Sequence, residues 1–371
     1  MTESLRTAKR LVVKIGSALL VDPQSLTIRR DWLAALGEDV AERRQRGQEI
    51  VIVTSGAIAA GRARLGLTDH PLKLEEKQAA AAVGQIHLAQ LYQEVLAGHG
   101  LTVAQILLTR EDTEARRRHL NARATIGQLL AFGTVPVINE NDTVTTAEIR
   151  FGDNDRLAAR VAGMISADTL VLLSDIDGLY TADPRKDPYA RHLPEIRDLS
   201  QEILAMAGPP APGISSGGMV TKLQAARIAL AAGCRMVIAR GEQLHPLRRV
   251  EAGALCSWFI PSAEPMTARK RWIAGSVAPA GGVVIDDGAA VALETGRSLL
   301  PAGILSVEGA FERGDAILVR RRDGRIAARG LSAYASAEIE RIRGHQSSEI
   351  EVLLGYRGRD EIIHRDDLVV G

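Results

Sequence analysis

The sequence is poor in cysteine, in aromatic residues and in net charge, and each shortage argues against a class of protein. Its two cysteines, Cys234 and Cys256, form no CxxC-type pair, so neither a disulfide framework nor a cysteine zinc site is expected. Its 46 basic and 45 acidic side chains leave a formal charge of +1, which gives no electrostatic reason to expect a nucleic-acid or membrane partner. Aromatic residues make up 3%, so the core must be built from Ala, Leu, Val and Ile.

Long apolar runs are also missing. The N-terminal stretch MTESLRTAKRLVVKIG has too short an apolar run for a signal peptide, and no segment is long enough to span a bilayer. The sequence therefore predicts a cytoplasmic protein. At 371 residues, 46% of them hydrophobic and 25% charged, the chain has the composition of a globular enzyme and the length of two domains.

Short β-branched runs alternate with helical patterns through about residue 240. The expected strands are Leu11–Ile15, Ile50–Thr54, Val103–Leu108, Val135–Asn139, Leu170–Ser174 and Met236–Ala239. The clearest segments with 3.6-residue periodicity are Ile28–Arg46, Lys77–Leu96 and Thr221–Ala232. Because strands that are apolar throughout are buried on both faces, we expect an α/β fold in which helices sandwich a largely parallel central sheet.

The pattern changes after Arg269–Arg271. Short strand-like runs, Val283–Ile285 and Ile317–Val319 among them, are then separated by glycine-containing turns, which is typical of a small β-rich domain. The predicted organisation is a first domain over residues 1–262, a linker over 263–279 and a β-rich domain over 280–371.

Polar and glycine residues follow four of the expected strands. The strand ends read Lys14-Ile15-Gly16-Ser17, Thr54-Ser55-Gly56-Ala57, Asn139-Glu140-Asn141-Asp142 and Ser174-Asp175. One such end is routine, since every strand must lead into a loop. In an open parallel sheet, however, ligands bind beyond the carboxyl ends of the strands, so four ends of this composition predict the lining of one shared cleft.

Lys14 lies in the apolar run LVVKIG, where a buried ammonium group needs an anion. Taken alone, it is equally well read as an edge lysine that extends its ammonium group to water. Gly16 and Ser17 directly after it favour the first reading, because a phosphate can approach the main chain closely there.

The glycine-rich stretch GPPAPGISSGG, residues 208–218, leads into a predicted helix that carries Lys222 about one turn from its start. Free N–H groups at such a helix start attract an anion, although glycine-rich loops are also common as simple connectors. The chain has no GxxxxGK[ST] motif, and no GxGxxG follows the first strand, which disfavours P-loop enzymes and nicotinamide dehydrogenases.

A third motif, FGDND at residues 151–155, opens another helical segment. Asp153 is readily explained as a helix N-cap. Two aspartates and an asparagine in three positions are more than capping needs, and we expect Asp155 to lie between Lys14 and Lys222.

Together these motifs resemble the amino-acid kinase superfamily, and within it the bacterial glutamate 5-kinase family. The resemblance is carried in order by VVKIGS, IVTSGAIAAG, PVINENDTV, FGDND, SDIDGLYTADP and SSGGMVTKLQAA. It continues into SLLPAGILSVEGAFERGD and GLSAYASAEI, which are similar to the PUA domain that many bacterial members append. Nearly the whole chain is covered.

The resemblance implies a role for each matching residue. Lys14, Asp155 and Lys222 would be catalytic, the lysines reaching the transferred phosphate and Asp155 orienting them. The implied amino-acid site comprises Ser55, Gly56, Ala57, Asn139, Asp142 and Asn154. The implied ATP site comprises Lys14, Gly16, Ser17, Ser174, Asp175, Ser216, Gly217, Gly218, Met219, Val220, Thr221 and Lys222.

The activity implied by the resemblance is ATP-dependent phosphorylation of the γ-carboxylate of L-glutamate, the first step of proline biosynthesis. Mg²⁺ would be carried mainly by ATP, and no protein metal ligand is predicted. Feedback inhibition by proline and a homo-oligomer are further implications of the family. The alternatives are another carboxylate kinase of the superfamily, such as acetylglutamate kinase, or an RNA-binding protein with a decayed kinase domain.

RNA binding is disfavoured by the C-terminal residues themselves. From Arg269 to Gly371 there are fifteen basic and fifteen acidic side chains, and after the run Arg269–Arg271 only Arg320–Arg322 cluster. Aromatic residues for base stacking are few in this part of the chain: Trp272, Phe311, Tyr334 and Tyr356. RNA is therefore not an expected partner, and the presence of Lys14, Asp155 and Lys222 argues against a decayed kinase.

Overall fold

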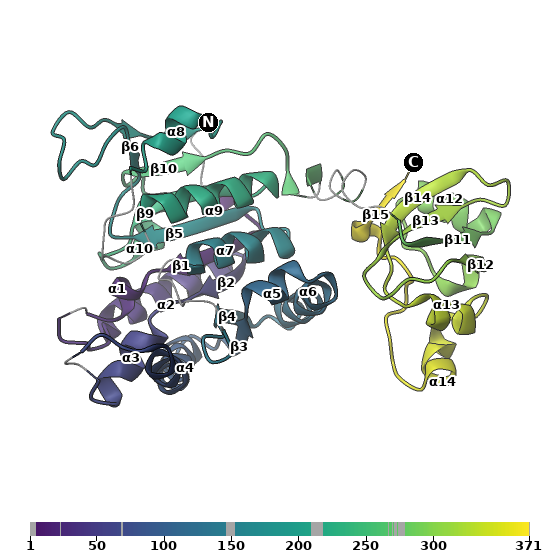
Figure 1. The fold of residues 1–371 in the computed structure, drawn as a ribbon, viewed down its shortest axis with the longest axis horizontal. Coiled ribbons are helices and arrows are strands. Elements are labelled where there is room, and N and C mark those ends of the chain that lie inside the picture. Colours follow the sequence, from purple (N-terminus) through teal and green to yellow (C-terminus); the bar gives the residue numbers. More distant parts are fainter. Residues whose placement is uncertain are drawn as a thin grey trace. The chain divides into compact units, whose positions relative to one another are not determined.

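The computed structural model describes residues 5–22, 24–67, 70–145, 153–208, 218–265, 267–268, 270, 273 and 279–370. The chain divides into two compact units, Met1–Pro265 and Met266–Gly371, each of which has its own sheet (Figure 1). The division falls within residues 263–279, where the sequence predicts a linker. The predicted domain limits themselves stay a prediction.

The first unit is built on an eight-stranded sheet in the order β3-β4-β2-β1-β5-β9-β10-β8. The six strands from β3 to β9 are parallel, whereas β10 runs antiparallel to β9 and parallel to β8. The strands are β1 Arg10–Ile15, β2 Glu49–Val53, β3 Val103–Leu108, β4 Val135–Glu140, β5 Thr169–Ser174, β8 Glu195–Ile196, β9 Arg235–Arg240 and β10 Cys256–Phe259. The largely parallel sheet predicted from the apolar runs is confirmed.

Helices cover both faces of this sheet (Figure 1). On one face, side chains of α2 and α4 pack with Leu11, Val13 and Ile15 of β1; on the other, side chains of α7 and α9 pack in the cluster that contains Val12. Strand β1 is therefore buried on both sides, which explains its continuous apolar sequence. The helices of this unit are η1 Leu5–Thr7, α1 Ser17–Leu20, α2 Arg30–Gln45, α3 Ala57–Arg64, α4 Leu74–Ala97, α5 Arg110–Glu114, α6 Arg116–Ala131, α7 Asp153–Met164, α8 Gln201–Ala205, α9 Met219–Ala231 and α10 Pro246–Glu251, and a small hairpin joins β6 Leu179–Tyr180 to β7 His192–Leu193.

Helices α3 and α4 touch through their backbones. A Cβ atom added at Gly84 would lie 1.8 Å from the carbonyl oxygen of Ala57, and one added at Gly61 would lie 1.8 Å from that of Ala80. Any larger residue at either glycine would force the two helices apart. The close crossing keeps α4 near the start of α3, which follows β2 at the carboxyl edge of the sheet.

The second unit contains a five-stranded sheet in the order β12-β11-β13-β14-β15. Its strands are β11 Gly281–Ile285, β12 Ile304–Glu308, β13 Ala316–Arg320, β14 Ile326–Leu331 and β15 Leu368–Val370. The small β-rich domain is thus confirmed, but helices that the sequence analysis did not predict pack with it: α12 Asp287–Glu294, α13 Ser336–Ile342 and α14 Ile350–Leu354, with the short turns η2 Pro301–Gly303, η3 Ser347–Glu349 and η4 Arg365–Asp367. None of the described helices in either unit combines the length and hydropathy of a membrane-spanning segment.

Candidate active site

The carboxyl ends of β4, β2, β1 and β5 lie side by side because these strands are parallel neighbours. Gly16 and Ser17 follow β1, Thr54 and Ser55 follow β2, and Asp175 follows β5. The sheet order therefore brings the polar strand ends of the sequence analysis to one edge. Ser216 and Gly217, which the sequence assigns to the ATP site, lie outside the described residues.

Two lysines share one buried carboxylate at this edge. The Nζ of Lys14, in β1, lies 2.5 Å from Oδ1 of Asp155, and the Nζ of Lys222, in α9, lies 3.2 Å from Oδ2 of the same residue. Asp155 is 1% exposed, Lys14 7% and Lys222 6%. Asp155 thus lies between the two lysines, in the place that the sequence analysis expected, while the catalytic roles stay a prediction.

Two members of this cluster, Asp155 and Lys222, lie in the first turns of helices. Asp155 is the third residue of α7 and Lys222 the fourth of α9, and the two helices pack against each other on the same face of the sheet. The hydroxyl of Thr221 donates to Oδ2 of Asp155 at 3.1 Å and also lies 2.9 Å from the carbonyl oxygen of Gly218. Thr221 therefore fixes the carboxylate from the start of α9.

The charge state of Asp155 follows from two opposing effects. Burial alone would raise the pKa of its carboxyl group, but the ammonium groups of Lys14 and Lys222 outweigh burial and hold the pKa below its ordinary value. Asp155 is consequently a carboxylate at neutral pH. The cluster carries two positive charges and one negative charge, and its net charge of +1 faces the carboxyl edge of the sheet.

Glycines beside the lysines leave the main chain accessible. An alanine Cβ at Gly16 would meet only the carbonyl oxygen of Leu173, at an ordinary 3.7 Å, and the φ of Gly16 is −70°. At Gly218, with φ −71°, such an atom would have no neighbour within 4 Å among the described residues. Packing and backbone geometry would both allow a side chain at these positions. The presence of glycine is explained if a ligand approaches the main chain closely there.

Ser174 and Asp175 form a bonded pair at the end of β5. The hydroxyl of Ser174 donates to Oδ1 of Asp175 at 3.0 Å, and Arg185 lies 3.4 Å from Oδ2. Burial raises the pKa of the Asp175 carboxyl group, but these partners together with Lys222 bring it below its ordinary value. Asp175 is therefore also ionised.

A group of carboxamides occupies the ends of β2 and β4. The Nδ2 of Asn154 lies 3.0 Å from the carbonyl oxygen of Thr54, 2.9 Å from Oγ of Ser55 and 3.0 Å from Oδ1 of Asn139. The Nδ2 of Asn139 in turn donates to Oε1 of Gln85, in α4, at 2.7 Å. Three of the predicted amino-acid-binding residues are thus brought into direct contact.

Two residues of this group were missed by the sequence analysis. Gln85 and Tyr92 lie seven residues apart on α4, and the hydroxyl of Tyr92 bonds the hydroxyl of Thr54 at 2.9 Å. Both side chains belong to the buried face of the helix. The only signal in the sequence is two polar groups at a two-turn spacing on an otherwise apolar face.

Two half-buried carboxyl groups lie at the end of β4. Burial, with the nearby charge of Asp142, raises the pKa of Glu140 to about 7, and burial raises the pKa of Asp142 to about 6. Each group can therefore be protonated or ionised near neutral pH. A cation bound beside them would favour the ionised carboxylates.

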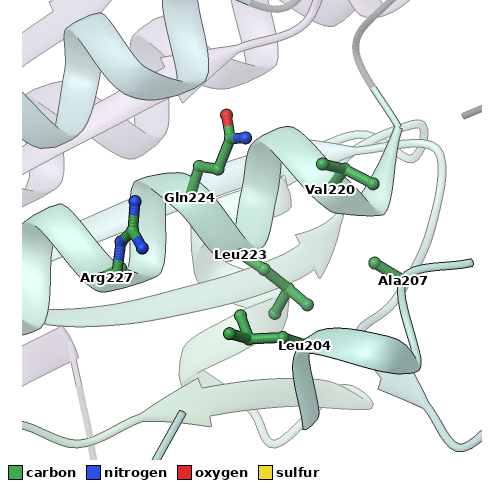
Figure 2. Close-up of a pocket in the computed structure, with 6 residues that line it drawn as sticks. All are labelled: Leu204, Ala207, Val220, Leu223, Gln224 and Arg227. Atoms are coloured by element: carbon green, nitrogen blue, oxygen red, sulfur yellow. The ribbon is translucent and has the colours of Figure 1, made fainter. Parts of the chain in front are cut away.

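An apolar groove of about 200 Å³ runs between α8 and α9, next to the helix start that carries Lys222. Figure 2 shows Leu204 of α8 facing Leu223 of α9, with Val220 one turn nearer the start of α9. The lining is completed by Ala207, Gln224 and Arg227. Val220 and Leu223 thus place apolar surface on the first turns of α9, the helix that also carries Lys222.

Among the described residues, no three His, Cys, Asp or Glu side chains gather as a metal cage. Mg²⁺ commonly keeps waters and phosphate oxygens as ligands and needs few from protein. The residues present therefore fit a magnesium ion that arrives with a polyphosphate rather than one held by the chain.

Known proteins match the chain along almost its full length. Residues 9–240 match the amino acid kinase family, and residues 281–354 match the PUA domain. The glutamate 5-kinase of Paramagnetospirillum magneticum is 63% identical over 99% of both chains, and that of Gluconobacter oxydans is 60% identical over 99% of this chain and 97% of its own. Among solved structures, the UMP kinase from Bacillus anthracis aligns with a TM-score of 0.48 and 15% identity over 69% of this chain and 97% of its own. From the family match and the identity of these relatives, the chain belongs to the amino acid kinase family and, within it, to the glutamate 5-kinases with a C-terminal PUA domain.

Proposed function

We propose that this chain transfers the γ-phosphoryl group of ATP to the γ-carboxylate of L-glutamate, which gives L-glutamyl 5-phosphate and ADP, the first step of proline biosynthesis. The observation that carries the proposal is the pair of buried lysines held by Asp155 at 2.5 and 3.2 Å. Family membership supplies the substrate, since the relatives are glutamate 5-kinases.

The chemistry needs charge neutralisation rather than a general base. A side-chain carboxylate has a pKa of about 4.3 and is already a nucleophile at pH 7. The obstacle is the approach of this anion to the polyphosphate of ATP, so catalysis consists of positioning and electrostatic stabilisation. Lys14 and Lys222 neutralise the transferring phosphoryl group, and Asp155 holds their ammonium groups in place.

The nucleotide fits the side of the cleft formed by β5 and α9. The N–H groups at the start of α9 and beside Gly16 donate hydrogen bonds to phosphate oxygens. The apolar groove lined by Val220 and Leu223 binds the base. Mg²⁺ that arrives with ATP would supply further neutralisation of the phosphate charge beside Lys14 and Lys222. Ser174 and Asp175 contact the nucleotide from the end of β5.

The amino acid fits the side formed by β2 and β4. Ser55 and the N–H groups of Gly56 and Ala57 begin α3 and present hydrogen-bond donors to a carboxylate. The positive φ of Gly56, 98°, is the geometry in which glycine is favoured at this turn. Asp142 and the carboxamide oxygen of Asn154 receive the α-ammonium group, which a free amino acid has and an N-acetylated one lacks.

The test is turnover of ATP with Mg²⁺ and L-glutamate, with the acyl phosphate trapped by hydroxylamine. N-Acetylglutamate, L-aspartate and carbamate run in parallel as acceptors. We expect hydroxamate with L-glutamate alone. Product with N-acetylglutamate instead would make the chain an acetylglutamate kinase and would refute the assigned acceptor. Absence of product with all four would refute the kinase function.

Proline and a second copy of the chain are the remaining proposed partners. Proline is the end product of the pathway and shares the α-nitrogen and carboxylate of glutamate, so its inhibition should be competitive with L-glutamate. Purely non-competitive inhibition would show a separate pocket. A homo-oligomer predicts a mass in light scattering that is a multiple of 39.8 kDa. The cytoplasm stays the predicted location.

The C-terminal unit offers little to RNA. Arg320 and Arg321, from its basic cluster, pair with Glu308 and Glu294, and Tyr334 and Phe311 are buried in its core. Charges already paired and aromatic rings already buried are not available for phosphates or bases. We therefore propose a structural or regulatory role for this unit. Micromolar RNA affinity at low salt, abolished by changing Arg320–Arg322, would contradict it.

A further inference from the structure

Helix α4 touches the amino-acid side of the cleft through Gln85. This side chain is 8% exposed, and its Oε1 accepts a hydrogen bond from Nδ2 of Asn139 at 2.7 Å. Asn139 itself is 2% exposed. Because Gln85 lies on a helix beneath the strand ends, it is placed to act on the site through Asn139.

The orientation of the Asn139 carboxamide follows from its neighbours. The backbone N–H of Glu140 can only donate, and it donates to Oδ1 of Asn139 at 2.9 Å. Nδ2 therefore points the other way and needs an acceptor, which Gln85 supplies. If the carboxamide were turned over, its NH₂ group would face two donors, the N–H of Glu140 and Nδ2 of Asn154.

The orientation of Asn154 follows in the same way. The carbonyl of Thr54 can only accept, so the group that faces it at 3.0 Å is Nδ2 of Asn154, which also donates to Oδ1 of Asn139 at 3.0 Å. The oxygen of Asn154 is thus turned away from both. It is buried and has no hydrogen-bond donor among the described residues. A buried acceptor left in that state is unfavourable unless a ligand brings a donor.

We propose that Gln85 is a positioning residue for the amino-acid substrate: through Asn139 it holds the carboxamide of Asn154 with its oxygen available to the substrate ammonium group. The proposal rests on the function proposed above. Without the acceptor on Gln85, Nδ2 of Asn139 is buried without a partner, and the carboxamide relieves this only by rotating away from Asn154. Asn154 then loses the acceptor on Asn139, and its carboxamide is held by the carbonyl of Thr54 and the hydroxyl of Ser55 alone.

The close packing of α4 against α3 places Gln85 near Asn139. Gly84, the residue before Gln85, lies so near the carbonyl of Ala57 that a Cβ atom would be 1.8 Å away. Helix α4 therefore cannot move toward α3, and α3 follows β2, the strand next to β4. A rigid helix is a better support for a binding group than a loop.

The experiment compares Gln85→Met, which keeps the length of the side chain and removes the acceptor, with Gln85→Asn, which keeps a carboxamide but is one methylene shorter. Gln90→Met, at an exposed position of the same helix, is the matched control. For each protein, KM for L-glutamate, KM for ATP, kcat and the thermal midpoint are measured. We expect both Gln85 variants to raise KM for L-glutamate roughly tenfold, the loss of about one hydrogen bond. KM for ATP should change less than about twofold, and the control should match the wild type.

An unchanged KM for L-glutamate in either folded Gln85 variant would overturn the proposal while leaving the kinase function intact. An equal rise in KM for L-glutamate and KM for ATP would also overturn the proposal, because Gln85 would then support the protein core in general and not the amino-acid site. If Gln85→Met does not fold, the polar Gln85→Asn variant decides. A wild-type protein that does not phosphorylate glutamate would instead refute the proposed function, so the two failures are distinguishable.

Discussion

Replacing Asp155 by asparagine keeps the shape of the side chain and removes the negative charge that Lys14 and Lys222 share. The two ammonium groups, 7% and 6% exposed, then remain buried without that carboxylate. Breaking a buried ion pair on one side costs about 3–5 kcal/mol of unfolding free energy. At about 2–4 °C per kcal/mol for a domain of this size, the thermal midpoint should fall by roughly 6–20 °C.

The same substitution should reduce turnover. With the carboxylate gone, the lysines are no longer held against the transferring phosphoryl group, and loss of one preorganised electrostatic contact typically lowers kcat by about 10²–10³-fold. Thermal unfolding without nucleotide and steady-state kinetics measure the two effects separately. Asp31→Asn is the matched control, since Asp31 also lies in the first turn of a helix, α2, but is exposed. It loses only a helix-dipole interaction of about 0.3–1 kcal/mol.

The dependence on pH gives the reasoning a second check. The folded pKa of Asp155 lies below the unfolded value of about 3.9, so its stabilisation is fully present above that pH. It is lost as the pH falls further, through the folded pKa, and this loss should be missing from Asp155→Asn. A variant whose midpoint stays within about 2 °C of the wild type, with kcat within about threefold, would refute the account of the cluster.

Further substitutions at Lys14, Lys222, Asp142 and Tyr92 test other parts of the site. Lys14→Ala and Lys222→Ala should each lower kcat by at least about 100-fold with a much smaller change in KM for ATP; a change in KM alone would make the lysine a binding residue. Because burial raises the pKa of Asp142 to about 6 and the substrate ammonium group requires the ionised form, KM for L-glutamate should fall as the pH rises from about 5 to 7.5. Asp142→Asn should flatten this profile and reduce discrimination against glutarate, whereas an unchanged profile would remove Asp142 from the role. Tyr92→Phe removes the hydrogen bond between the two hydroxyls, leaves that of Thr54 only the carbonyl oxygen of Ser55 at 3.3 Å, and should cost about 1–2 kcal/mol in urea unfolding. Adding Thr54→Val should cost less than the two single changes together.

The central strands of the first unit were predictable because burial on both faces imposes continuous apolar sequence, whereas the short strands β6, β7, β8 and β10 were not predicted. The expected run Leu170–Ser174 corresponds to β5, Thr169–Ser174, and Met236–Ala239 to β9, Arg235–Arg240. The short helices of the second unit were missed, since five to eight residues are too few for a clear 3.6-residue period. For α12 a signal was present: Asp286 caps the helix by accepting from the N–H of Ala289 at 2.7 Å.

The difference between Asp155 and Gln85 shows which parts of a site a sequence reveals. A lysine within an apolar strand favours a nearby anion, and the motif FGDND supplies candidate carboxylates for Lys14. A neutral carboxamide is satisfied by any backbone or side-chain partner, so Gln85 within α4 requires nothing in particular. Its partner becomes evident only when the crossing of α3 and α4 at Gly84 places it beside Asn139. Charged groups of the site are therefore constrained by composition and local sequence, whereas the neutral groups that orient them depend on how closely distant segments pack.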